Sequence, residues 1–142
     1  MSRSYNFIDH TADIAAELKG SSLEELFIAG ADAWLASVTE NIKIESDDSI
    51  DIELSGLTRE ELLVTFMNEL NYLLITKKWI CLSVESMKIF KDDNLCDLSA
   101  ELKGISLKEN FIIKNEIKSV TYHQVEIVER NNEFSTLVVF DI

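Results

Sequence analysis

The sequence predicts an α+β domain in which two helices pack on a mainly antiparallel sheet. Three observations predict it: two strand-like segments open the chain, two segments in its first half carry apolar residues at helical spacing, and alternating β-rich segments fill the remainder. The 142 residues suffice for one core, and neither an internal repeat nor a linker-like stretch divides them. We therefore expect residues 1–142 to form a single domain.

Both predicted helices have clear start signals. Ser22 and Thr58 are each followed by two glutamates in the expected first turn, which is typical of a capped helix. The first helix is expected to run to about Val38. Glu69, on the second helix, is interpreted as an ordinary boundary residue, with a role near a functional site as the alternative. The expected buried stripe of the second helix consists of Leu62, Leu63, Phe66, Met67, Leu70, Leu73 and Leu74, with Asn68 and Glu69 beside it.

The strands are predicted from period-two alternation and β-branched or aromatic residues. Turn-forming residues at 91–94 and 130–132 predict two hairpins. One or two strands are expected between residues 39 and 54. The other expected strands cover residues 5–8, 13–19, 80–84, 87–90, 95–102, 110–114, 117–128 and 134–142.

Composition and charge exclude several classes of function. The 26 acidic and 13 basic residues give a net charge of -13, which would repel a phosphate backbone and favours a cation or a basic protein partner. Solubility alone accounts for most of these charges. Only four glycines occur, so no glycine-rich phosphate loop is expected. No apolar run approaches the ~18 residues of a membrane span. Cys81 and Cys96 lack metal-binding spacing, so we expect reduced thiols and a cytoplasmic protein.

Residues 9–13 hold two carboxylates, an imidazole and a hydroxyl between two predicted strands. Asp13 opens the second strand, so its carboxylate is expected to be partly desolvated and to need a compensating partner. Asp141 ends the apolar run 137–140 in the same way, and Ile142 adds main-chain or terminal oxygen. We expect these two ends of the chain to meet. Oxygen ligands suit Ca²⁺, Mg²⁺ or Mn²⁺, whereas the alternative for each aspartate is a capping or strand-terminating role.

The two histidines and the cysteines do not predict a catalytic centre. His10 is interpreted as a hydrogen-bonding residue that shapes its loop, and His123 lies on a predicted strand that could approach the acidic site. No Ser/His/Asp or Cys/His arrangement is present. Trp34 and Trp79 are expected in or beside the core, because no basic residues accompany them as in a base-stacking surface.

Several motifs together resemble the archease family. The resemblance implies an archease-like, SHS2-related fold. The sequence departs from the family's pattern at one place, where a Gly-Glu pair expected near Gly104 appears as Gly104-Ile105. The match runs nearly from end to end. The motifs that carry it are Phe7-Ile8-Asp9-His10-Thr11-Ala12-Asp13-Ile14, Gly20-x-x-Leu23-Glu24-Glu25-Leu26-Phe27, Leu62-Leu63 to Phe66-x-Asn68-Glu69-Leu70, Lys118-x-Val120-Thr121-Tyr122-His123 and Val139-Phe140-Asp141-Ile142.

The resemblance implies a non-catalytic activator of an RtcB-type RNA ligase, which acts in tRNA splicing and RNA repair. The resemblance further implies that the chain promotes GTP-dependent guanylylation of the ligase and multiple turnover. The resemblance assigns the metal site to Asp13, Asp141 and Ile142, with Ca²⁺ as the first expectation and Mg²⁺ or Mn²⁺ as alternatives. Two other functions are open: a stand-alone divalent-cation-binding, chaperone-like interaction module, and a small-molecule enzyme that uses Asp13, His10 and Asp141. The acidic balance predicts that any RNA is held by the partner.

Overall fold

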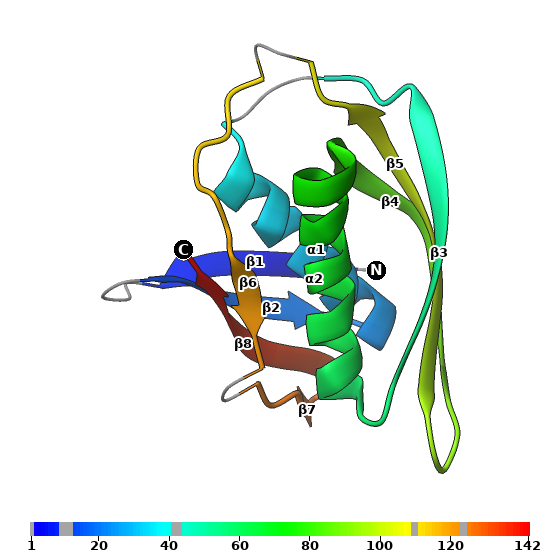
Figure 1. Ribbon diagram of the computed structural model, residues 1–142. Helices are drawn as coiled ribbons and strands as arrows, with labels where there is room; N and C mark the ends of the chain where they lie inside the picture. Colours follow the sequence, from blue (N-terminus) through cyan, green and yellow to red (C-terminus); the bar gives the residue numbers. More distant parts are fainter. Residues whose placement is uncertain (1, 9–12, 41–43, 109–110, 123–124) are drawn as a thin grey trace.

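The fold of two helices and antiparallel strands confirms the predicted α+β class (Figure 1). The computed structural model describes residues 2–8, 13–40, 44–108, 111–122 and 125–142. No helix among them is long and apolar enough to cross a membrane. The elements in chain order are β1 (Arg3–Ile8), β2 (Asp13–Gly20), α1 (Leu23–Val38), β3 (Asp48–Gly56), α2 (Arg59–Lys77), β4 (Trp79–Lys91), β5 (Cys96–Ser106), β6 (Ser119–Thr121), β7 (Val128–Arg130) and β8 (Glu133–Asp141).

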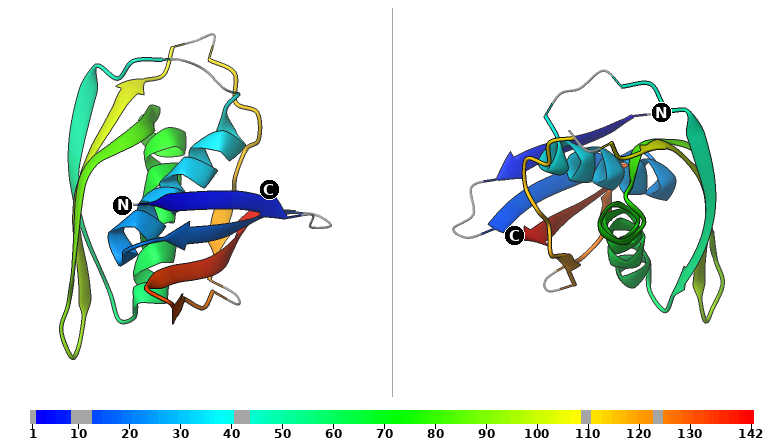
Figure 2. Two further views of the ribbon diagram at one scale, coloured as in Figure 1. Left: turned by 180° about the vertical axis from the view of Figure 1, so that it is seen from behind. Right: turned by 45° about the horizontal axis from the view of Figure 1, so that its top comes forward.

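The strands form two antiparallel sheets, with the helices between them, where one sheet was expected. The larger sheet has the strand order β1-β2-β8-β6, with β7 paired to β8, and the smaller has the order β3-β5-β4. Figure 2 shows α2 nearly end-on between the two sheets. Both helices contact strands of both sheets. A single cluster of buried apolar residues fills the space between the layers.

The two helices begin where the sequence predicts. The side chains of Ser22 and Thr58 accept hydrogen bonds from the backbone N–H groups three residues later, each at 3.1 Å. Gly20 lies directly before the first of these caps, and a Cβ atom there would approach the backbone nitrogen of Leu26 to 2.3 Å. The end of β2 therefore packs against the first turn of α1 more closely than a side chain would permit.

The predicted core residues are buried. All seven residues of the expected stripe on α2 are at most 7% exposed. Trp34 and Trp79 are also buried, and their indole N–H groups donate to Asn71 Oδ1 and Asp48 Oδ2, each at 3.2 Å. Asn71 in turn donates to the carbonyl of Ile117 at 2.7 Å. This buried asparagine therefore links α1, α2 and the segment that leads into β6.

The strands expected at 80–84 and 87–90 form one strand, β4. It runs from Trp79 to Lys91 along β5, with register shifts between Cys81 and Ser83 and between Val84 and Ser86. Such bulges change which face a side chain occupies, so the alternation in the sequence is interrupted although the pairing continues. The strand expected between residues 39 and 54 is β3, which begins only at Asp48.

The strands expected at 110–114 and 117–128 are largely wrong in their described residues, and residues 110, 123 and 124 lie outside the part that the structure describes. The described residues 111–114 form no strand, because the N–H of Lys114 donates to the last carbonyl of α1, Val38, at 2.8 Å. Within the described residues of the second segment, 117–122 and 125–128, only β6 is regular before β7 begins at Val128. The N–H of Ile127 donates to Glu60 Oε2 at 3.0 Å, and its carbonyl accepts from Arg59 at 3.1 Å. Bonds to helix ends and side chains thus replace ladder bonds in both places.

Candidate functional site

The two ends of the chain meet as expected. Asp13, the first residue of β2, lies directly opposite Asp141, the last residue of β8. Their neighbours Ile14 and Phe140 are also paired and belong to the core, or pack against it. Because side chains alternate between the faces of a sheet, both aspartates lie on the face turned away from the helices. The Cβ atoms of such a directly opposed pair are about 4.5–5.5 Å apart.

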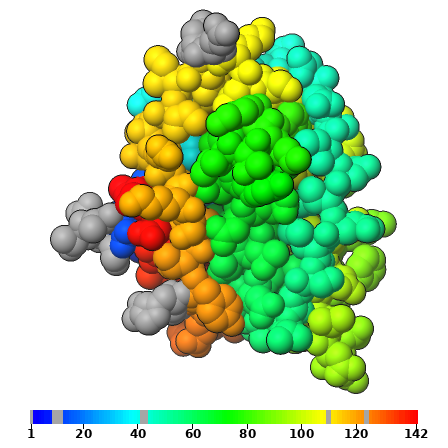
Figure 3. Space-filling model, viewed as in Figure 1, coloured from blue at the N-terminus to red at the C-terminus, as the bar shows by residue number. Residues whose placement is uncertain are grey.

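The position of Asp141 is fixed from both sides of β8. On one side it pairs with Asp13, and on the other it pairs with Ser119 of β6. The backbone N–H of Lys118 also donates to the carbonyl of Asp141 at 2.7 Å. Figure 3 shows the red end of the chain at the surface, beside orange atoms of the segment that contains β6. The acidic pair therefore lies at a braced, accessible end of the sheet.

Asn68 of α2 is the side chain that holds β6 in this place. Its amide nitrogen donates to the carbonyl of Val120 at 3.1 Å, and its amide oxygen accepts from the N–H of Val120 at 2.8 Å. Both backbone groups of the central residue of β6 thus bond to one side chain. In the sequence, Asn68 is predicted only to lie beside the buried stripe of this helix. Its position within the Phe66-x-Asn68-Glu69 motif was the only signal available.

The two facing aspartates form a site that suits a hard cation. Both are partly buried, and like charges directly opposite each other on a sheet repel. A divalent cation held between the two carboxylates would relieve that repulsion with the oxygen ligands that Ca²⁺ and Mg²⁺ prefer. Ile142 follows Asp141 and is 40% exposed. No group of three or more His, Cys, Asp or Glu side chains within the described part of the chain is placed to hold a metal. Main-chain oxygen and water would complete the coordination.

The other candidate residues lie in different places. Asp9, His10, Thr11 and His123 fall outside the residues that the structure describes. Glu69 is partly buried on α2, which agrees with its interpretation as a boundary residue. Ile105, at the Gly104-Ile105 departure, lies in β5 of the smaller sheet and packs against the core. That departure is therefore in a different sheet from the aspartate pair.

Neither cysteine is placed as a nucleophile. Cys81 and Cys96 are buried free thiols. Burial raises the pKa of Cys81 from 9.0 to about 12, so the thiol stays protonated at neutral pH. Because the thiolate is the reactive form, Cys81 has the environment of a structural cysteine.

Fold and site together define a small acidic α+β protein whose second and last strands, β2 and β8, place two carboxylates side by side. The model of the Archease protein family (MTH1598/TM1083) matches residues 5–142, and this chain belongs to that family. Protein archease of Archaeoglobus fulgidus is 33% identical over 138 residues, which cover 97% of this chain and 98% of the relative. Protein archease of Methanosarcina barkeri is 31% identical over 147 residues, covering 99% and 97%.

Two solved structures have the same fold. The solution structure of Methanobacterium thermoautotrophicum protein 1598 superposes with a TM-score of 0.81 at 28% identity, covering 97% of this chain and 98% of that one. The crystal structure of a Thermotoga maritima protein, described as an archease and possible chaperone, gives a TM-score of 0.65 at 29% identity, covering 95% and 94%. The family resemblance and the fold class inferred from the sequence are thereby confirmed.

Replacing Asn68 with alanine should loosen β6. The change leaves the N–H and carbonyl of the buried Val120 without their partner, so the free energy of unfolding should fall by about 2–4 kcal/mol. Denaturant unfolding measures the loss, and hydrogen exchange should show faster exchange at Val120. Thr76→Ala, at an exposed position of the same helix, should change stability by less than about 0.5 kcal/mol. Equal effects of the two changes would contradict this role for Asn68.

The raised pKa of Cys81 predicts a loss of stability in alkali. Between pH 9.0 and about 12 the unfolded chain releases this proton while the folded chain keeps it, so the free energy of unfolding falls as pH rises through that window. Other groups titrate there too, so the measured quantity is the difference between the wild type and Cys81→Ala. The variant should lose less stability between about pH 8 and about pH 10. Identical pH profiles would show that burial does not hold this proton.

Proposed function

We propose that this chain is a non-catalytic activator of an RtcB-type RNA ligase, and that its divalent-cation site consists of Asp13, Asp141 and the main-chain oxygen of Ile142. The observation that carries the proposal is the in-register pairing of Asp13 with Asp141. These are the same two positions to which the family resemblance assigns the metal. Membership of the archease family supports the choice of the ligase as partner.

The proposed mechanism depends on the charge and shape of this end of the molecule. The acidic pair projects from the end of the larger sheet and enters the basic, metal-containing active site of the ligase. There the two carboxylates help to hold metal and GTP in position while a histidine nitrogen of the ligase attacks the α-phosphorus of GTP and pyrophosphate leaves. A divalent metal held by Asp13 and Asp141 would neutralise charge on the phosphates. The chain itself contributes position and negative charge, and no covalent step occurs on it.

The RNA substrate is assigned to the ligase surface. With 26 acidic and 13 basic residues, the chain carries a net charge of -13, which opposes binding of a phosphate backbone. The same charge accelerates association with a basic protein surface at low salt. Activation should therefore weaken as ionic strength rises.

A cation-binding, chaperone-like interaction module is the alternative. The Thermotoga maritima structure, described as an archease and possible chaperone, supports it. Such a module would retain unrelated clients in solution and would not require GTP. A small-molecule enzyme is the third candidate, and it would turn over substrate without any ligase.

Removing either carboxylate should strongly reduce activation. Asp13→Asn and Asp141→Asn keep side-chain volume and remove one ligand charge, so each should reduce ligase guanylylation at limiting activator at least about tenfold, which corresponds to about 1.4 kcal/mol. The measurement is incorporation of labelled guanylate into the ligase, followed by RNA joined per ligase molecule. Calcium should raise the melting temperature of the wild type, and it should not change the melting temperature of either variant.

The control for these variants is Glu17→Gln. Glu17 lies on β2 on the same face as Asp13, and the substitution removes the same charge as Asp13→Asn. Its partner on β8 is Leu137 and not an acidic residue. It should activate the ligase like the wild type. Full activation by folded Asp13→Asn and Asp141→Asn variants would contradict the proposal. Suppression of client aggregation without GTP or ligase would favour the chaperone-like alternative, and turnover of GTP by the chain alone would favour an enzyme.

A further inference from the structure

The outer edge of β1 is a free edge of the larger sheet. β1 stands first in the strand order, and among the described residues it pairs with β2 alone. All six of its residues are exposed, including Tyr5 at 39% and Phe7 at 43%. Exposed edge strands with large apolar side chains are templates for the addition of another strand. The edge is thus open to pairing through its backbone.

The register identifies the backbone groups that face outward. The N–H of Ser21 donates to the carbonyl of Ser2 at 2.8 Å, and the β1–β2 pairing continues from there without a register shift. In an antiparallel ladder, bonded and non-bonded pairs alternate. The even-numbered residues of β1 therefore bond to β2. The N–H and carbonyl groups of Arg3, Tyr5 and Phe7 point to the free edge.

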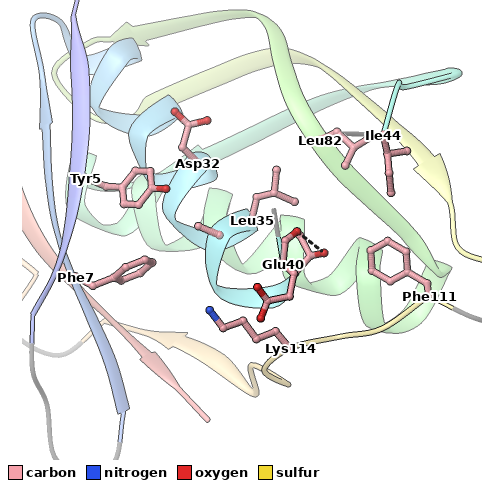
Figure 4. A pocket seen from close by; sticks show the side chains of 11 residues that line it. Tyr5, Phe7, Asp32, Leu35, Glu40, Ile44, Leu82, Phe111 and Lys114 are labelled. Atoms are coloured by element: carbon pink, nitrogen blue, oxygen red, sulfur yellow. Dashed lines mark hydrogen bonds between the residues drawn. The ribbon is translucent and has the colours of Figure 1, made fainter. Parts of the chain in front are cut away.

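The side chains of the same three residues lie over α1, beside a pocket. Tyr5 and Phe7 project from β1 into a pocket of about 620 Å³, and their rings meet edge to face at 5.4 Å (Figure 4). Leu35 of α1 and Phe111 extend its apolar wall, and Glu40 and Lys114 lie between Phe7 and Phe111. A strand added to β1 would place every second side chain toward this pocket.

The charges beside Tyr5 favour a basic side chain. Arg3 donates to Asp32 at 2.7 Å and to Glu25 at 3.3 Å, so two carboxylates face one guanidinium. Asp32 also lines the pocket next to Tyr5, and a second pocket, of about 540 Å³, adjoins it along Arg3 and Ser4. The two carboxylates and one guanidinium leave a net negative charge beside Tyr5. A lysine or arginine opposite Tyr5 would therefore lie near this negative charge and against the face of an aromatic ring.

We propose that the free edge of β1 binds an extended segment of a basic partner protein as an added strand. Backbone bonds to Arg3, Tyr5 and Phe7 hold the segment, a large apolar side chain opposite Phe7 enters the pocket, and a basic side chain opposite Tyr5 lies beside Asp32. A second copy of the chain is disfavoured as occupant, because each copy carries a net charge of -13. The surface is separate from the aspartate pair, which lies on the other face of the sheet, so the proposal does not rest on ligase activation.

The test uses the full chain and a short synthetic peptide in which leucine and lysine are separated by one threonine. Its control peptide has the same composition and charge, with leucine and lysine adjacent. Binding of the first peptide should slow amide exchange at Arg3, Tyr5 and Phe7 at least about tenfold. Ser4 and Asn6 should not change, because their amides already bond to β2.

Two matched variants separate the pocket face from the opposite face of the same strand. Phe7→Ala should weaken binding of the first peptide about tenfold. Ile8→Ala, at 42% exposure on the other face, should leave the affinity unchanged. Equal binding of both peptides would overturn the proposal, because charge alone would then explain it. Unchanged amide exchange at Arg3, Tyr5 and Phe7 would also overturn the proposal. If these amides instead became protected as the protein concentration rises without peptide, the occupant would be a second copy of the chain, and the proposal would again be wrong.

Discussion

The structure depends on the pairing of β2 with β8, which joins the beginning of the chain to its end. Eight successive residue pairs, from Asp13 with Asp141 to Gly20 with Phe134, form this ladder in the middle of the larger sheet. Because side chains alternate in period two, a shift of one residue would turn Leu18 and Phe140 from the core into solvent. The burial of these side chains therefore fixes the register of the two aspartates. The aspartate pair at the end of the sheet is thus positioned by apolar packing along the whole length of the ladder.

The two faces of the larger sheet carry different kinds of side chain. The face turned away from the helices carries the facing carboxylates, which are suited to a cation. The face toward α1 carries Tyr5 and Phe7, and beside them a pocket between the free edge and the helix. One surface suits a metal-containing site, and the other suits an extended chain. Both require the β1–β2–β8 order, which brings strands from opposite ends of the sequence together.

The sequence predicted the features that depend on local chemistry. The caps at Ser22 and Thr58 and the buried stripe of α2 follow from capping residues and helical periodicity. The expected meeting of Asp13 with Asp141 is a long-range contact, and it rested on the apolar runs beside both carboxylates and on the family resemblance.

Other features that depend on distant partners were not predicted. The segment after Phe111 has strand-like residues, but its backbone caps α1 instead. The role of Asn68 requires β6 to lie against α2, and the free edge of β1 exists only once the strand order is known. Alternation in one segment cannot reveal which element will satisfy its backbone groups.

If the register of β2 against β8 creates the proposed cation site, calcium should bind between the two facing aspartates. A crystal structure of the chain in saturating calcium tests this. We expect a single ion between the carboxylates of Asp13 and Asp141, with oxygen ligands from both at about 2.3–2.6 Å. An ion bound elsewhere, an ion held by only one of the two aspartates, or no ion at all would contradict it.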